Sequence, residues 1–326
     1  MAYDRCLWDA GTVAAQRPGG PAFGAGRALT MRGRPTSTSG LHNTSAVSLD
    51  CATAFQTIAL DCIASIKAQH SSACAGDAEA VHQIRVAITR LRAAVAFFAP
   101  IVVDAEWLRL KKEIAWLNGS LGAARDSDVL VEYARRKRYR GWAEHIIKQA
   151  DQCQTRDHRR LVRCLRTVRT RRLISAIAEW TRQGEWLARC KRNETEALQA
   201  YCARELNRWH ERLIRKGRHL KALGESRRHR LRIRVKRFRY MLEALTETVA
   251  LQSRGELHHL HRPAKRMQRA LGDLRDLRRF AGLPSRSPQA ESGKRSKVPP
   301  GYRHRRKVLL GAAIASYREL KQARAC

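Results

Sequence analysis

The chain has 326 residues, which is long enough for one large domain or two smaller ones. Hydrophobic residues make up 44% of it and aromatic residues only 6%. Lysine and arginine number 65 against 29 acidic residues, which gives a formal net charge of +36. A folded surface this basic repels itself, and it favours a polyanionic partner: nucleic acid, an anionic membrane or an inorganic polyanion. Because no run of 18 uncharged apolar residues occurs, we expect no membrane-spanning helix and a cytoplasmic location.

Residues 1–47 are rich in Gly, Pro, Ser, Thr and Arg and lack a helical period, so we expect a disordered basic extension. Helical periodicity begins at Ser48 and continues almost to the end of the chain, interrupted by a Pro/Ser/Lys-rich loop at 283–301 that we expect to be disordered. The predicted helices cover about 48–70, 77–98, 104–121, 126–152, 155–187, 191–222, 226–251, 256–281 and 302–322. Because no strand pattern is convincing, the predicted fold class is all-α.

The nine cysteines are irregularly spaced, and none forms a Cys-x-x-Cys pair. An odd count without such pairs argues against a disulfide framework and against a structural zinc site. Cys62, Cys164 and Cys202 fall at apolar helical positions, where we expect small buried side chains in a reducing compartment. We therefore expect no metal and no other cofactor.

Two stretches repeat one pattern: VHQIRVAITRLRAAVAFF at 81–98 and RHRLRIRVKRFRYMLEAL at 228–245. The matching pairs, each 147 residues apart, are His82 and His229, Arg85 and Arg232, Arg90 and Arg237, and Arg92 and Arg239. LGAARD at 121–126 likewise matches LGDLRD at 271–276 with an offset of 150. We infer one domain over 48–323 made of two related halves, about 48–152 and 155–323. Packing around a pseudo-twofold axis would bring the two stretches towards each other.

On a helical wheel, each repeated helix has an apolar face beside a basic stripe. The apolar faces contain Val81, Ile84, Ile88, Leu91, Val95 and Phe98 in the first copy, and Leu231, Val235, Phe238, Leu242 and Leu245 in the second. The stripes contain His82, Arg85 and Arg92 with Thr89 between them, and His229, Arg232, Lys236 and Arg239 with Tyr240 at the edge. One such stripe is compatible with a solvated face whose arginine stems cover apolar edges. Two copies in register, with few acids to relieve the repulsion, favour anion binding.

Acidic residues follow both LG motifs: Asp126 and Asp128 in RDSD, and Asp273 and Asp276 in GDLRD. A metal site or acid–base catalysis is one interpretation of these carboxylates. Helix capping and orientation of a cation explain them better, since Asp126 is predicted to open a helix beside Arg125. No HExxH, P-loop, GxSxG or GxGxxG motif occurs, so we expect no catalytic residues and no enzyme activity.

At these motifs the sequence resembles the CHAD family, the conserved-histidine α-helical domain. The resemblance covers about 48–323 and rests on VHQIRVAITRLR, WLNGSLGAARDSDVL, RLIRKGRHLKALGESRRHRLRIRVKRFRYMLEAL and MQRALGDLRD. It implies a helical bundle of two similar halves whose basic central cleft binds inorganic polyphosphate, in association with polyphosphate granules. It implies binding rather than catalysis, because the ExExK signature of the CYTH triphosphatase domain, which often accompanies CHAD domains, is absent.

The polyphosphate-binding residues that the resemblance implies come from the stripes and from two matching segments. They are His82, Arg85, Arg90, Arg92, Arg125, Arg212, Arg215, Lys216, Arg218, His219, His229, Arg232, Lys236, Arg237, Arg239 and Tyr240. Two positions depart from the family pattern: Thr89 stands where a basic residue is usual, and Arg275 where an asparagine is frequent.

Two alternatives to polyphosphate binding stay open: a basic helical protein that binds nucleic acid, and a metal-dependent phosphatase that acts on phosphate chains. A chain this cationic is expected to bind nucleic acid non-specifically in vitro. The scarcity of aromatic residues favours polyphosphate over single-stranded nucleic acid, whose binders stack bases on aromatic rings.

Overall fold

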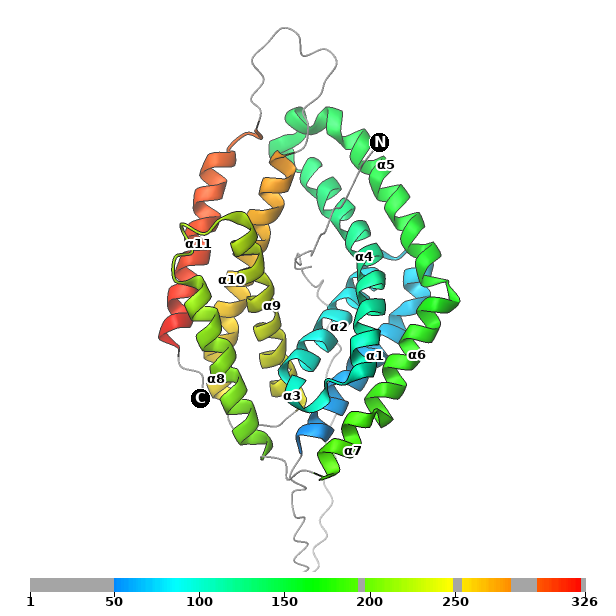
Figure 1. The fold of residues 1–326 in the computed structure, drawn as a ribbon. Helices are drawn as coiled ribbons and strands as arrows, with labels where there is room; N and C mark the ends of the chain where they lie inside the picture. Colours follow the sequence, from blue (N-terminus) through cyan, green and yellow to red (C-terminus); the bar gives the residue numbers. More distant parts are fainter. Residues whose placement is uncertain (1–49, 193–196, 249–253, 283–297, 324–326) are drawn as a thin grey trace, which may run out of the picture. The chain divides into compact units, whose positions relative to one another are not determined.

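The structure is a computed structural model that describes residues 50–192, 197–248, 254–282 and 298–323. Every regular element in these ranges is helical (Figure 1), which confirms the predicted all-α class. The helices are α1 (Cys51–Cys74), α2 (Ala78–Phe97), α3 (Ala99–Val102), α4 (Ala105–Ala134), α5 (Arg140–Leu165), α6 (Val168–Gln183), α7 (Glu185–Arg192), α8 (Leu198–Gly217), α9 (Glu225–Thr248), α10 (Arg254–Ala281) and α11 (Tyr302–Gln322), with a 3₁₀ turn at Lys137–Tyr139. The predicted extension 1–47 and the part of the predicted loop at 283–297 lie outside the described residues.

Aspartate side chains cap three of the helices that precede or carry the repeated motifs. Asp50 accepts a hydrogen bond from the backbone N–H of Thr53 at 2.6 Å, and Asp104 accepts one from Trp107 at 2.7 Å. Asp77 accepts from Glu79 and Ala80, which confirms it as the N-cap of α2. Each cap satisfies N–H groups that have no partner within the helix.

Helix α4 continues through the region where the sequence analysis placed a break. The predictions that a helix ends near Gly122 and that Asp126 opens the next one are wrong, because α4 runs unbroken from Ala105 to Ala134. A helical glycine costs only about 1 kcal/mol relative to alanine, which the burial of neighbours such as Leu121 and Ala124 outweighs.

The actual breaks after α4 lie elsewhere. The first falls at residues 135–139, so the helix predicted over 126–152 is divided between α4 and α5. The second falls at Arg166 and Thr167, where the Thr167 side chain accepts a hydrogen bond from the Thr170 N–H and caps α6. The predicted breaks near Gly184 and Gly224 are confirmed.

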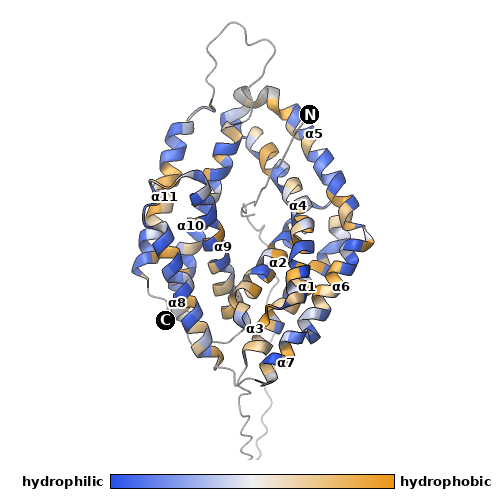
Figure 2. Ribbon diagram, viewed as in Figure 1, coloured by the Kyte–Doolittle hydropathy of each residue, from blue (hydrophilic) through white to orange (hydrophobic). Residues whose placement is uncertain are grey.

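Two groups of buried side chains form the core. The larger joins α1, α2, α6, α8 and α9, together with parts of α4 and α10. The smaller packs Val129 and Tyr133 of α4 against Leu277 and Phe280 of α10 and Leu309 of α11. Figure 2 shows polar and apolar residues alternating along the helices, as expected for amphipathic segments that each bury one face.

The described cysteines carry free thiols, and none forms a disulfide with another described residue. Cys62 and Cys202 are buried as predicted, whereas Cys164 is only partly buried. No helix in the described part of the chain has both the length and the apolar character needed to cross a bilayer.

Helices that carry the repeated motifs contact one another. Along the chain, α1 packs against α2, α4 against α5, α9 against α10, and α10 against α11. In addition, α2 contacts α9 and α4 contacts α10, so the two His-x-x-Arg helices meet, and so do the two LG-x-x-RD helices. The division into two halves, the pseudo-twofold axis and the central cleft stay predictions.

Candidate anion-binding site

The apolar faces predicted for α2 and α9 are buried, and several of the cations beside them are buried too. Every residue predicted for the two faces is less than 9% exposed. Of the stripe residues, Arg85 is 5% exposed, Arg232 1% and Lys236 8%. A charged group at such depth is costly unless oppositely charged or polar groups surround it.

The acids of the LG-x-x-RD motifs lie beside the arginines of the His-x-x-Arg motifs. On α4, Asp126 pairs with Arg279 of α10 at 3.2 Å and also interacts electrostatically with Arg85 of α2. On α10, Asp276 interacts in the same way with Arg232 of α9. Asp126 does pair with a cation, although that cation is Arg279 and not the adjacent Arg125, and its predicted capping role is wrong.

Burial dominates the protonation of both carboxyl groups. It raises the pKa of Asp126 to about 7, although Arg279, Arg275 and Arg85 act in the opposite direction. Burial likewise raises the pKa of Asp276 against the opposing effect of nearby arginines. Near neutral pH, Asp126 therefore neutralises only part of the positive charge around it.

Helix α2 contributes His82 to the same region. Burial lowers the pKa of His82, as do the positive charges of Arg125, Arg85 and Lys236, while Glu79 acts in the opposite direction. The lowered pKa favours the neutral form of the imidazole. An anion bound among these cations would reverse part of the effect and favour the charged imidazolium.

A contact between α2 and α9 joins two residues at equivalent positions of the repeat. The Lys236 ammonium donates a hydrogen bond to Thr89 Oγ1 at 3.4 Å, and the two residues are 147 apart, which is the offset of the repeat. A residue that meets its own counterpart is what a pseudo-twofold axis between α2 and α9 would produce. The contact also gives a physical reason for the departure at Thr89, since a second cation there would face Lys236 at close range.

A pocket of about 370 Å³ opens beside this region, between α9, α10 and α11. Its apolar and aromatic lining residues include Leu271 and Leu274 of α10 and Tyr302 of α11. Its basic lining residues are Arg228, His229, Arg230, Arg232, Arg275, Arg278, Arg279 and Arg306. Helix α10 packs against both α9 and α11 (Figure 1), so three consecutive helices supply these cations.

The pocket has a large excess of positive charge. Seven arginines line it, and Glu225 is the only acid among the lining residues, paired with Arg278 at 2.9 Å. Burial lowers the pKa of Arg228, and the like charges of Arg306 and Arg278 add to this effect. Guanidinium groups crowded in this way repel one another, and a bound anion with several oxygens would relieve the repulsion.

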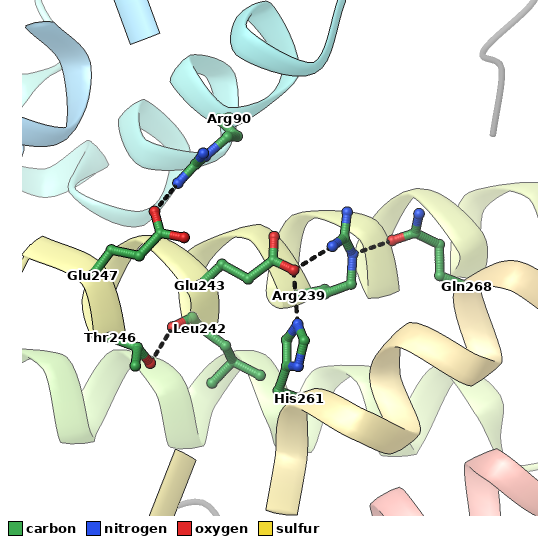
Figure 3. A network of polar contacts seen from close by, with 8 residues as sticks. All are labelled: Arg90, Arg239, Leu242, Glu243, Thr246, Glu247, His261 and Gln268. Atoms are coloured by element: carbon green, nitrogen blue, oxygen red, sulfur yellow. Dashed lines mark hydrogen bonds and ion pairs between the residues drawn. The ribbon is translucent and has the colours of Figure 1, made fainter. Parts of the chain in front are cut away.

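Further along α9, a polar network already pairs several predicted site residues (Figure 3). Arg90 forms an ion pair with Glu247. Arg239 pairs with Glu243 and donates to Gln268 at 2.8 Å, and Glu243 also contacts His261 at 2.7 Å.

The same network encloses Tyr240, because the guanidinium of Arg239 lies over its ring, 4.2 Å from the centroid. Tyr240 is only 3% exposed, which leaves little of the side chain for a ligand to touch. That Arg90, Arg239 and Tyr240 bind polyphosphate stays a prediction. Their geometry favours a role in joining α2, α9 and α10.

Comparison with known proteins places the chain in a family. A family model described as CHAD domain matches residues 57–283, which is more than half of the chain. The chain belongs to the CHAD domain family.

Two solved structures share the CHAD fold with this chain. The crystal structure of the CHAD domain from the plant Ricinus communis superposes with a TM-score of 0.67 at 23% identity, covering 86% of this chain and 95% of that one. PptA from Streptomyces chartreusis superposes with a TM-score of 0.54 at 16% identity, covering 84% and 97%. A search of curated proteins gives no match.

The remaining residues that the CHAD resemblance implied are distributed over several surfaces. Arg92, on α2, and Arg237, on α9, are partly exposed. The cations at the end of α8 and in the following turn are exposed, and they are not among the residues that line the pocket: Arg212, Arg215, Lys216, Arg218 and His219. Of the implied set, the structure therefore gathers His82, Arg85, Arg125 and Lys236 into one group and His229 and Arg232 into the adjoining pocket.

Sequence reasoning missed most of the pocket arginines of this CHAD domain. Arg228 and Arg230 flank His229 directly, so their proximity to the stripe was readable from the sequence. Arg278 and Arg279 follow Arg275 at the three- and four-residue spacing that shares a helix face. Arg306 enters from α11, and only the packing of α11 against α10 reveals it.

Proposed function

We propose that this CHAD protein binds inorganic polyphosphate without catalysing a reaction on it. The observation that carries the proposal is the pocket between α9, α10 and α11, where seven arginines face one glutamate. The group around His82, Arg85, Arg125 and Lys236 extends the basic lining towards α2 and α4. Together the two would form the basic cleft that the resemblance to the family implies.

The chemistry of polyphosphate suits this lining. Polyphosphate is an unbranched chain of phosphate units with about one negative charge per unit and no bases. Arginine is well matched to it, because each planar guanidinium donates two parallel hydrogen bonds to phosphate oxygens. Nucleic-acid binders of single strands add aromatic rings that stack bases, whereas Tyr302 is the only aromatic residue among those that line the pocket.

Association with polyphosphate granules would follow from this binding. A protein with net charge +36 concentrates on a polyanionic surface without needing a separate targeting segment. Fluorescent fusions in the native host, with and without the capacity to make polyphosphate, would test this part of the proposal. The protein should follow the granules and become diffuse when they are absent.

Titration calorimetry with long-chain polyphosphate is the direct test of binding. The expected result is saturable binding that orthophosphate at the same phosphorus concentration does not reproduce, because many linked charges displace more counterions than single ones. A parallel incubation with Mg²⁺ or Mn²⁺ should release no phosphate. Release that depends on the metal would establish the phosphatase alternative, and absence of saturable binding would refute the proposal.

A further inference from the structure

The anion-binding lining of this chain differs between the two copies of the repeat. Four of the six arginines that α9 and α10 place in the pocket have no basic counterpart in the first copy. At the equivalent positions, Arg228 corresponds to Val81, Arg230 to Gln83, Arg278 to Asp128 and Arg279 to Val129. The cationic pocket is therefore a feature of the second copy.

The carboxylate that replaces an arginine in the first copy is held by its own neighbours. Asp128 contacts His158 Nε2 at 2.7 Å and accepts a hydrogen bond from Gln154 at 2.9 Å, both from α5. Helix α5 packs against α4 much as α11 packs against α10. Where the second copy has Arg278 on α10 beside Arg306 from α11, the first copy has a carboxylate on α4 that α5 pairs, and this carboxylate would repel a phosphate.

The second-copy pocket is lined in part by a buried cation and not only by side chains at the surface. Arg232, which lines it, is 1% exposed, and its Nε lies 3.5 Å from the position that a Cβ on Gly272 would occupy. That distance is an ordinary van der Waals contact, so the guanidinium packs against α10 at Gly272. The pocket's volume of about 370 Å³ is near the lower end for small-molecule sites, which suits a compact anion.

The two ends of a linear polyphosphate differ chemically from its middle. An inner unit has two free oxygens and one negative charge. A terminal unit has three free oxygens and a second ionisable proton, which by analogy with a phosphate monoester is lost at about pH 6. A cluster of guanidinium groups should therefore favour a terminal unit over an inner one.

We propose that the pocket between α9, α10 and α11 holds the terminal phosphate of a linear polyphosphate, whose chain then runs past Arg232 towards Arg85 and Arg125. This inference rests on the proposed function and adds to it a direction of binding and a preference for chains with free ends. The larger number of basic residues in the second copy than in the first would orient the chain.

Linear tripolyphosphate and cyclic trimetaphosphate test the proposal, because both have three phosphate units and only the first has ends. We expect the wild-type protein to bind the linear form about ten-fold more tightly near pH 8, with a smaller preference near pH 5.5 as the terminal units gain protons. Arg278→Gln with Arg306→Gln should remove most of that preference. The control pair Arg171→Gln and Arg172→Gln, on exposed α6 positions, removes the same charge and should retain it.

A variant that is expected to bind more tightly keeps the proposal testable if the arginine variant fails to fold. Glu225→Gln removes the only acid of the pocket lining and should tighten binding of the linear form more than that of the cyclic form. Equal affinity of the wild type for the two ligands, or an unchanged preference in the pocket variant, would overturn the proposal. Long-chain polyphosphate, titrated alongside, separates the cases: if it fails to bind the wild type, the proposed function itself is wrong.

Discussion

Replacing three exposed arginines of the pocket should change the salt dependence of polyphosphate binding by a calculable amount. Arg230, Arg278 and Arg306 line the pocket from three different helices, and each is exposed, so substitution by glutamine should leave the fold intact. The ion pair of Arg278 with Glu225 is at the surface and contributes little to stability.

The expected magnitude follows from the charges removed. For single-stranded polyanions, the slope of log affinity against log salt is about 0.7 per neutralised phosphate, so three lost contacts should reduce the slope by about 2. Each exposed arginine–phosphate contact contributes about 1 kcal/mol, so the three together should weaken binding about a hundred-fold at low salt.

The assay is displacement of labelled long-chain polyphosphate, followed by fluorescence polarisation over a series of salt concentrations. The matched control carries Arg171→Gln, Arg172→Gln and Arg182→Gln on α6, all exposed, and loses the same three charges. If the control and the pocket variant show the same slope, binding depends on net charge alone. The assignment of the site to α9, α10 and α11 would then be refuted.

Three further predictions concern stability. Arg239→Ala should lower the free energy of unfolding in urea by up to about 3 kcal/mol, because it removes a buried guanidinium that pairs with Glu243 and donates to Gln268, although His261 still contacts Glu243. Arg234→Ala, an exposed change on the same helix, should have little effect, and equal effects would contradict the structural role of Arg239. Burial raises the pKa of Asp126 from 3.8 to about 7, so the folded state favours the protonated carboxyl group. The contribution of this group to the free energy of unfolding is therefore fully present below pH 3.8 and is lost as the pH rises through 7. Asp126→Asn should therefore flatten the decline of unfolding free energy between pH 4 and 7, and an unchanged decline would refute this. Thr89→Lys should place a second ammonium beside Lys236, where two charges about 4 Å apart at an effective dielectric constant near 20 repel by at most about 4 kcal/mol. The melting temperature should therefore fall, and polyphosphate should raise it more in this variant than in the wild type. An unchanged melting temperature would contradict the contact between Lys236 and Thr89.

The fold class and the core-facing residues could be predicted because both depend on local periodicity. The 3.6-residue spacing identified the apolar faces of α2 and α9, and every residue assigned to them is buried. The interior of α4 could not be predicted in the same way. Gly122 and Asp126 favour a helix end locally, and tertiary packing overrides that preference.

The candidate site was only partly predictable because its cations come from separate helices. The repeat identified Arg85, Arg232 and Lys236, which do lie beside the interface of α2 and α9. It also grouped Arg239 with them, although Arg239 faces Glu243 and Gln268. A helical wheel does not show which acidic residues of neighbouring helices will lie beside the stripe. The positions of those acids decide which arginines form ion pairs within the protein and which line the pocket.

The most direct test of the central claim is a competition measured near physiological ionic strength. Labelled long-chain polyphosphate would be displaced by unlabelled polyphosphate, double-stranded DNA or single-stranded RNA, each at the same concentration of phosphate charge. We predict that unlabelled polyphosphate displaces the label and that neither nucleic acid does so at equal charge, because the pocket arginines accommodate a chain without bases. Equal displacement by DNA or RNA would mean that the protein is a general cationic surface, and it would contradict a function in binding polyphosphate.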